Sequence, residues 1–258
     1  NVVGLRGSAG RVPKHPDKLG WNTLSVQGAM ARTVEDVALM MQAISGPDAR
    51  VPISLAEPGA LFARPLAREF AGTRVAPALG GLAPVAARVV AAIDAQRPTF
   101  ESLGCATFEA IADFGDAREV FHVQRAQIFA ATHAEHYARH RDLLKDTIVW
   151  NVEQGLKLTA RQIADAELKR TALFERVHEF FERYEFLILP TAQVLPFPVE
   201  EPWVGEIDGR PMADYLEWMT SCWIITVTGH PAVSVPCGFS PEGLPIGAAG
   251  RTVSLRFG

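Results

Sequence analysis

An alternation of strand, helix and strand between residues 74 and 111 constrains the fold of this chain more than any other feature. RVAPAL at 74–79 and CATFEAI at 105–111 are predicted strands, and a helix is expected between them, from Pro84 to Leu103. A crossover helix joins strands that run in the same direction, so this unit predicts parallel pairing. The continuous apolar run FLILP, at 186–190, is typical of a strand buried on both faces. The sequence therefore predicts an α/β fold, with a mixed β-sheet covered by helices on both faces.

Helical periodicity accounts for much of the remaining chain. Residues 33–44 place apolar side chains on one face after a threonine that can cap the helix. Residues 117–184 are compatible with helix almost throughout, with a break expected at Gly155. Thr159 and Gln162 have the spacing of a capping box. Shorter helical pieces are expected at 61–70 and 212–223.

The two ends of the sequence differ from ordinary polar termini. Val2 and Val3 are apolar and β-branched and precede a glycine-punctuated stretch, which predicts a strand that runs into a turn. PAVSVP, at 231–236, is the last clear strand. A chain of 258 residues can bury a sizeable core, and we expect one α/β domain over residues 1–258.

Composition excludes several classes of protein. The net charge is −4, from 25 basic and 29 acidic residues, and no block of Lys and Arg stands out, so nucleic acid is not expected as a partner. No apolar run approaches the roughly 20 residues that span a membrane, so no membrane association is expected. Three widely spaced cysteines form neither a disulfide framework nor a metal cluster, and they favour a cytoplasmic location.

Ser8 is the one serine near a nucleophile-like motif, in the stretch GSAG. A nucleophile elbow has glycine two residues before the serine, and Arg6 occupies that position. Lys14 and Lys18 lie nearby in the sequence, but nothing marks either as a buried base. A tight turn after a strand is therefore the favoured interpretation.

Histidines and glycines provide the remaining candidates for metal or cofactor binding. His133, His136 and His140 fall on one helical face, but they do not form an H-E-x-x-H motif, and a solvated face is favoured over a metal site. Gly80 and Gly81 lie between a strand and a helix without the G-x-G-x-x-G pattern of a dinucleotide site. We expect neither a metal nor an organic cofactor.

Three stretches together resemble the amidase signature family of C–N hydrolases, and bacterial amidases most. They are VVGLRGSAGRVP with WNTLSVQGAMARTVEDVALMMQAISGPD at 2–48, FLILPTAQVLPFP at 186–198, and TVTGHPAVSVPCGFSPEGLPIG at 226–247. Their order and approximate spacing also match the family. The resemblance implies the family's α/β fold and hydrolysis of small-molecule amides. The terminal text AAGRTVSLRFG departs from the family pattern, so the fold is expected to be incomplete at both ends.

The resemblance also implies where the chemistry lies. The family uses a serine nucleophile, a second serine and a lysine, all upstream of the position that matches Val2. None of these elements occurs in this sequence, so the resemblance gives no catalytic residue here. It implies a C-terminal part of an amidase that starts just after the nucleophilic serine. Such a chain supplies scaffold and pocket wall, and a missing N-terminal part is its expected partner.

The same resemblance implies that the acyl pocket is lined from the stretch EWMTSCWIITVTG. We therefore expect Met219, Trp223 and Thr226 to contact substrate, together with Thr191 at the end of the buried strand. For each residue, ordinary core packing is at least as good an interpretation, and for Trp223 above all. His230, between glycine and proline, is expected to be a structural corner.

Two alternatives of other classes stay open. One is a non-catalytic amidase-like protein with a structural or partner-binding role. The other is the scaffold part of an amidotransferase subunit that acts on charged tRNA, which the net acidic balance disfavours. A homodimer is also left open, and the sequence does not identify the amide.

Overall fold

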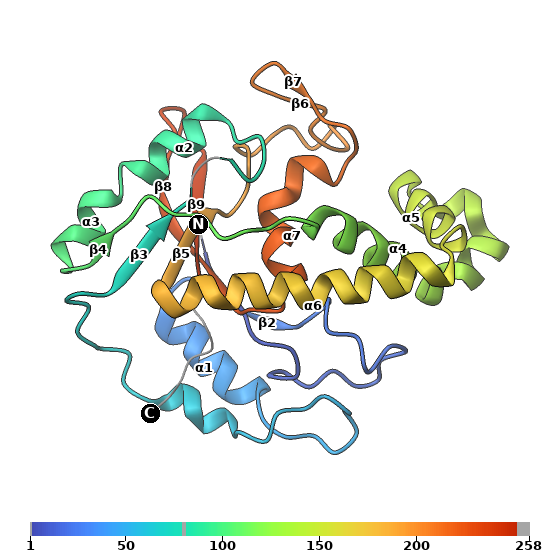
Figure 1. Ribbon diagram of the computed structural model, residues 1–258, viewed down its shortest axis with the longest axis horizontal. Coiled ribbons are helices and arrows are strands. Elements are labelled where there is room, and N and C mark those ends of the chain that lie inside the picture. The colour runs from blue at the N-terminus through green and yellow to red at the C-terminus, as the bar shows by residue number, and fades with distance from the viewer. Residues whose placement is uncertain (1, 79–80, 252–258) are drawn as a thin grey trace.

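A computed structural model describes residues 2–78 and 81–251 of the chain. Its centre is a seven-stranded mixed sheet with the strand order β2-β1-β8-β9-β5-β3-β4 (Figure 1). The strands of this sheet are β1 Val3–Arg6, β2 Gly28–Ala31, β3 Arg74–Pro77, β4 Ala106–Thr107, β5 Phe186–Pro190, β8 Ala232–Phe239 and β9 Pro245–Arg251. A separate hairpin is formed by β6 Glu206–Ile207 and β7 Arg210–Pro211.

The predicted strand–helix–strand unit is confirmed. Strand β3 pairs in parallel with β4 on one side and with β5 on the other. The remaining neighbours in the large sheet pair antiparallel, which makes the sheet mixed. The strand predicted at the start of the chain is also confirmed as β1.

The prediction that PAVSVP is the last clear strand is wrong. Strand β8 extends to Phe239, and β9 then returns antiparallel between β8 and β5. The sequence of β9, PIGAAGR, is rich in glycine and alanine and has a single β-branched residue, so propensity does not reveal it. Its small residues fit a crowded position, because a Cβ on Gly247 would lie 3.1 Å from Oγ1 of Thr191. The terminal stretch 252–258 and Gly80 lie outside the described residues.

The α-helices of the described residues are α1 Val34–Ile44, α2 Ala87–Asp94, α3 Arg97–Ser102, α4 Ala117–His140, α5 Asp146–Leu156, α6 Ala160–Arg183 and α7 Thr220–Val227. The predicted caps are present. Thr33 Oγ1 accepts the N–H of Asp36 at 3.1 Å at the start of α1. Thr159 and Gln162 form a reciprocal capping box at the start of α6. These contacts satisfy amide groups that a helix leaves unpaired at its N-terminus.

Several helix boundaries differ from the prediction. The helix expected at 84–103 is two helices, α2 and α3, and the piece expected at 61–70 is a 3₁₀ turn at Gly59–Ala63. The helix expected at 212–223 is shifted, with a 3₁₀ turn at Glu217–Met219 leading into α7. In each case the helical character of the region was predicted correctly, and local packing sets the limits of the helix.

The break expected at Gly155 lies just beyond it, because α5 ends at Leu156 and α6 begins at Ala160. A second interruption, which was not predicted, lies before α5 and includes a 3₁₀ turn at Arg141–Leu143. A Cβ on Gly155 would lie 2.1 Å from the carbonyl oxygen of Ala126 in α4. The glycine therefore also permits close contact of two helices.

Helices cover both faces of the sheet, as predicted. Side chains alternate along β5, so Leu187 and Leu189 pack in one core with α4, α6 and α7, while Ile188 packs on the opposite face with α2. Helix α1 covers the opposite face at the β1–β2 end, through Val37 and Met41. In Figure 1, α6 crosses in front of the sheet, and α4 and α5 extend beyond its side.

Candidate substrate pocket

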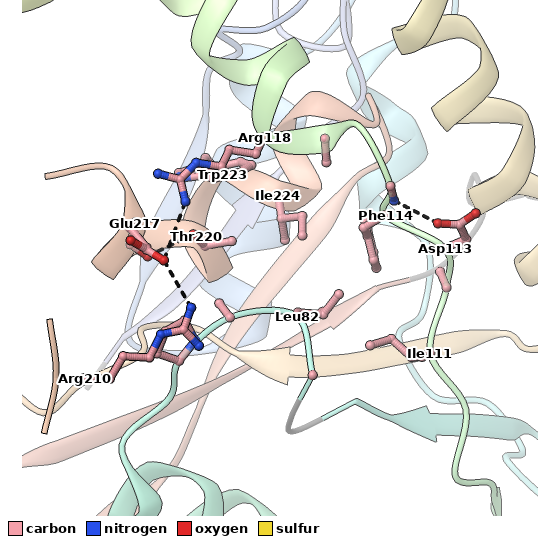
Figure 2. Close-up of a pocket in the computed structure, with 16 residues that line it drawn as sticks. Leu82, Ile111, Asp113, Phe114, Arg118, Arg210, Glu217, Thr220, Trp223 and Ile224 are labelled. Carbon is pink, nitrogen blue, oxygen red and sulfur yellow. Dashed lines mark hydrogen bonds and ion pairs between the residues drawn. The ribbon is translucent and has the colours of Figure 1, made fainter. Parts of the chain in front are cut away.

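A cavity of about 680 Å³ lies where α7 meets the start of α4 (Figure 2). The loop at 81–84 and the segment at 111–115 complete its wall. Its larger apolar side chains are Leu82, Ile111, Phe114, Trp223 and Ile224. The volume is within the range of small-molecule sites, and the wall combines these apolar side chains with charged and polar groups.

Trp223 belongs to both the cavity wall and the core. Its side chain is 5% exposed, and its indole ring stacks on Phe121 with a centroid separation of 4.5 Å. Its Nε1 donates to the carbonyl oxygen of Leu216 at 2.9 Å, which satisfies the one polar atom of the ring. The ring is thus held in place by stacking and by a hydrogen bond.

A charged corner of the cavity is formed around the carboxylate of Glu217 (Figure 2). Arg118 Nη1 lies 3.5 Å and Arg210 Nη2 lies 3.4 Å from Oε1 of Glu217. The other oxygen, Oε2, accepts the N–H of Ala213 at 2.7 Å. Arg118 also pairs with Asp214 at 3.0 Å. One buried carboxylate therefore joins α4 to the β6–β7 hairpin and to the chain that follows it.

His122 lies behind this corner, among the aromatic rings of Trp150 and Trp223. Burial lowers the pKa of its imidazole, against the opposing effect of the Asp214 carboxylate, whose Oδ2 is 4.0 Å from Nε2. A neutral ring is favoured there, and this is consistent with its aromatic neighbours.

Gln193 connects the segments that build the cavity, and it is fully buried. Its Nε2 donates to the carbonyl oxygens of Pro84 at 2.6 Å and of Glu217 at 3.1 Å. Its Oε1 accepts the N–H of Ser221 at 3.0 Å. The amide thus satisfies backbone groups of two separate segments and holds the loop at 81–84 next to the start of α7.

Thr191 faces a second cavity, of about 380 Å³, together with Trp218 and Gly247. Its Oγ1 lies 2.8 Å from Oγ of Ser234, and its carbonyl oxygen lies 3.3 Å from Sγ of Cys222. The residue ends the buried strand β5, as predicted, but its cavity is not the one that Trp223 lines.

Met219 and Thr226 occupy other positions around α7. Met219 packs against the core that contains Trp223. The carbonyl oxygen of Thr226, at the other end of α7, accepts from Nη2 of Arg6 at 3.5 Å. The four predicted residues therefore surround one short helix and the end of β5, and they do not line one cavity together.

Two arginines lie at the C-terminal end of α7. Arg6 Nη1 donates to the carbonyl oxygen of His230 at 2.8 Å, and Arg170 Nε donates to that of Val227 at 3.0 Å. Burial, together with the charge of Arg170, lowers the pKa of Arg6 to about 10. Cations at this end of a helix complement the partial negative charge of its carbonyl groups.

The other sequence candidates behave as structural features. Ser8 lies in a turn, where its carbonyl oxygen accepts the N–H of Arg11 at 3.1 Å, and Lys14 pairs with Asp17 at 3.0 Å. Within residues 2–78 and 81–251, no group of three His, Cys, Asp or Glu side chains is arranged to hold a metal ion. His230 is buried and stacks on Phe174, as a corner residue does.

Sequence reasoning missed the charged corner and the buried amide. Arg118 is distant in the sequence from Arg210 and Glu217, and each of the three is of a type that is usually solvated. Gln193 follows FLILPT by one residue, and only its position after a buried strand could have indicated it.

The fold has counterparts among known proteins. The family model for Amidase matches residues 1–249, so the chain belongs to the amidase family. It is 26% identical to an acylamidase of Rhodococcus erythropolis over 95% of this chain and 52% of that protein. It is 31% identical to an amidase of Pseudomonas putida, over 95% of this chain and 53% of that protein.

A solved structure supports the fold independently. The chain superposes on a bacterial aryl acylamidase of the amidase signature family with a TM-score of 0.84, at 24% identity, over 98% of this chain and 55% of that structure. The chain thus spans about half the length of the relatives that it matches. None of the described helices is long and apolar enough to cross a membrane.

Proposed function

We propose that this chain is the scaffold and pocket-wall part of an amide hydrolase whose serine, second serine and lysine lie on an upstream segment. Membership of the amidase family supports the reaction class. The observation that carries the assignment is the cavity beside α7, because α7 lies directly before the family-like stretch GHPAVSVPCGF. Trp223 is the residue of this proposal that contacts substrate in this cavity. Substrate contacts of Thr191, Met219 and Thr226, which do not line it, stay predictions.

The substrate class is a small-molecule amide with an apolar acyl group. Leu82, Phe114 and Trp223 offer an apolar surface that removes such a group from water. In the proposed reaction the serine oxygen attacks the amide carbon, and the amine leaves with a proton. Water then hydrolyses the resulting ester, which releases the acid and restores the serine. This chain orients the acyl group for both steps.

The test uses the polypeptide encoded by the whole gene and its variant Trp223→Ala. We expect the ratio of kcat/KM values for bulky and small acyl groups to change about tenfold, because the smaller side chain enlarges the cavity. Trp21→Ala is a matched control, since Trp21 is 77% exposed. Unchanged specificity together with a loss of about 3–5 kcal/mol in unfolding free energy would assign Trp223 to the core alone.

Residues 1–258 by themselves are expected to release no ammonia or amine from aryl or aliphatic amides. The nucleophile and its proton-transfer partners act as a unit, and their loss removes on the order of 10⁶ in rate where such sets have been dissected. Turnover that Ser8→Ala abolishes would contradict the proposal. Turnover that persists in the Ser8→Ala variant would indicate a different catalytic group.

The proposal includes a cytoplasmic location for the protein. Cys105, Cys222 and Cys237 are free thiols, which is usual for a cytoplasmic enzyme. Sedimentation of the whole polypeptide would test the homodimer that the sequence left open. A non-catalytic amidase-like role is the alternative, and absence of hydrolysis by the whole polypeptide across an amide panel would favour it.

A further inference from the structure

A buried glutamine connects two parts of the cavity wall that are distant in the sequence. Gln193 is 0% exposed, and it is not among the described residues that line the cavity of about 680 Å³. The residues that do line it include the loop at 81–84, together with Glu217 and Thr220 at the start of α7. Gln193 bonds to both of these parts, so it acts on the cavity through the position of the wall.

The hydrogen bonds of the Gln193 side chain use both the donating and the accepting ability of a carboxamide. Its Nε2 donates to the carbonyl oxygens of Pro84, at 2.6 Å, and of Glu217, at 3.1 Å. Its Oε1 accepts the N–H of Ser221 at 3.0 Å. A methionine side chain of similar size donates no hydrogen bond, and a glutamate carboxylate can only accept. The two bonds to carbonyl oxygens therefore require the amide.

Gln193 is itself tied to the central sheet. It follows the buried strand β5, which ends at Pro190, and the N–H of Thr191 between them donates to the carbonyl oxygen of Gly247 in β9 at 3.0 Å. The carbonyl oxygen of Gln193 accepts the N–H of Ala86 at 2.8 Å, just beyond the loop at 81–84. Both the main chain and the side chain of one residue thus position this loop relative to the sheet.

We infer that Gln193 is a positioning residue that sets the size of the acyl group accepted by the cavity. The inference rests on the proposed function, in which the acyl group packs against Trp223. Leu82, on the loop, and Trp223, on α7, both line the cavity (Figure 2). The Gln193 amide fixes the distance between these two side chains, because it bonds to Pro84 and to α7. An apolar wall contacts the acyl group equally in the bound substrate and in the transition state, so its displacement changes KM more than kcat.

The first test compares the polypeptide encoded by the whole gene with its variant Gln193→Met, which keeps the side-chain volume and removes the donated bonds. We expect KM for amides with small acyl groups to rise about fivefold, as for the loss of one hydrogen bond of ordinary strength, with kcat changed less than about twofold. KM for bulky acyl groups should change less, because a freer loop leaves them more room. Unchanged KM values for both kinds of amide in a folded variant would overturn the inference.

The matched control is Gln124→Met. Gln124 is also buried, at 3% exposed, and its Nε2 donates to Oε1 of Glu167 at 2.8 Å, which joins α4 to α6. A glutamine with a structural role alone should lower the free energy of unfolding when replaced and leave KM within about twofold. An equal rise of KM in the Gln124 and Gln193 variants would therefore overturn the inference.

A second variant, Gln193→Glu, tests the inference even if Gln193→Met fails to fold. A protonated carboxyl at this position can donate one hydrogen bond and accept another, whereas a carboxylate would face the carbonyl oxygens of Pro84 and Glu217. Burial beside these oxygens raises the pKa of that carboxyl above its usual value. We expect KM for small acyl groups, relative to the unmodified protein at the same pH, to rise about fivefold between about pH 5 and about pH 9. A ratio that stays at one across this range would contradict the role of Gln193.

Hydrogen exchange provides a measurement that does not depend on hydrolysis. The Ser221 amide loses its acceptor in Gln193→Met, so it should exchange at least about tenfold faster there than in Gln124→Met. Equal exchange of this amide in the two variants would overturn the inference. Faster exchange in a polypeptide that hydrolyses no amide keeps the role of Gln193 in holding the wall and refutes the hydrolase. Amide hydrolysis with an unchanged preference for acyl size in both Gln193 variants keeps the hydrolase and refutes the inference.

Discussion

The two ends of the central sheet differ in how many of their faces are covered by helices. At β5, Leu189 is 1% exposed and packs with α4, α6 and α7, while its neighbour Ile188 packs with α2 on the other face. At β2, Ala29 is buried under α1, but Met30 on the other face is open to solvent. Helices of this chain cover both faces of the sheet at β5, but they cover only one face at β2.

This difference indicates which part of the fold contributes most to the free energy of folding. Burial of apolar surface is the main favourable term in folding, so β5 and its helices supply most of it. Strands β1 and β2 lose less apolar surface to the interior, and β2 forms hydrogen bonds on one edge. Residues 1–258 in isolation are therefore expected to be poorly stable, with β2 as the first strand to open.

The largest effect is expected at the closed end, from Leu189→Ala in the whole polypeptide. The leucine is fully enclosed by the largest core, so the change leaves a cavity that rigid neighbours cannot fill. We expect a loss of about 2–5 kcal/mol in the free energy of unfolding. Denaturant titration measures this free energy. A loss below about 1 kcal/mol would show that the core around Leu189 relaxes freely, and it would contradict the difference between the two ends of the sheet.

A smaller effect is expected where α4 and α5 touch. Gly155→Ala places a methyl group 2.1 Å from the carbonyl oxygen of Ala126, so the two helices must separate. We expect a loss of about 1–3 kcal/mol, as for other overpacked sites. Gly205→Ala is the matched control, because a Cβ at Gly205 meets nothing within 4 Å. Equal melting temperatures for the two variants would contradict the close contact.

The sequence was sufficient for the fold class and for the elements with strong local signals. The parallel β3–β4 pair, the buried strand β5 and the caps at Thr33 and Thr159 follow from short-range pattern and spacing. Strand β9 was missed because its stability comes from its two neighbours and not from its own residues. The packing role of Gly155 was missed because it depends on a contact with α4 that is distant in sequence, and local propensity registers only the cost of glycine in a helix.

The candidate pocket was predictable in part. The neighbourhood of α7 was chosen from the family resemblance, and Trp223 does line a cavity there. The partners of Glu217 come from α4 and from β7, so no local pattern joins them. Nor does the sequence separate Thr191 from Trp223, because the cavity that each residue lines is set only by the folded chain.

The smallest effect is expected at the open end, from Met30→Ala in residues 1–258. The side chain already lies in water, so its removal exposes no core and forms no cavity. We expect a change within about 0.5 kcal/mol in the free energy of unfolding, measured by denaturant titration. Met41→Ala in α1 is the matched methionine control, because Met41 is fully buried under the same pair of strands, and its loss should be about 2–5 kcal/mol. A loss of unfolding free energy at Met30 as large as that at Met41 would mean that residues 1–258 themselves cover the face of β1 and β2 on which Met30 lies. The two ends of the sheet would then be alike.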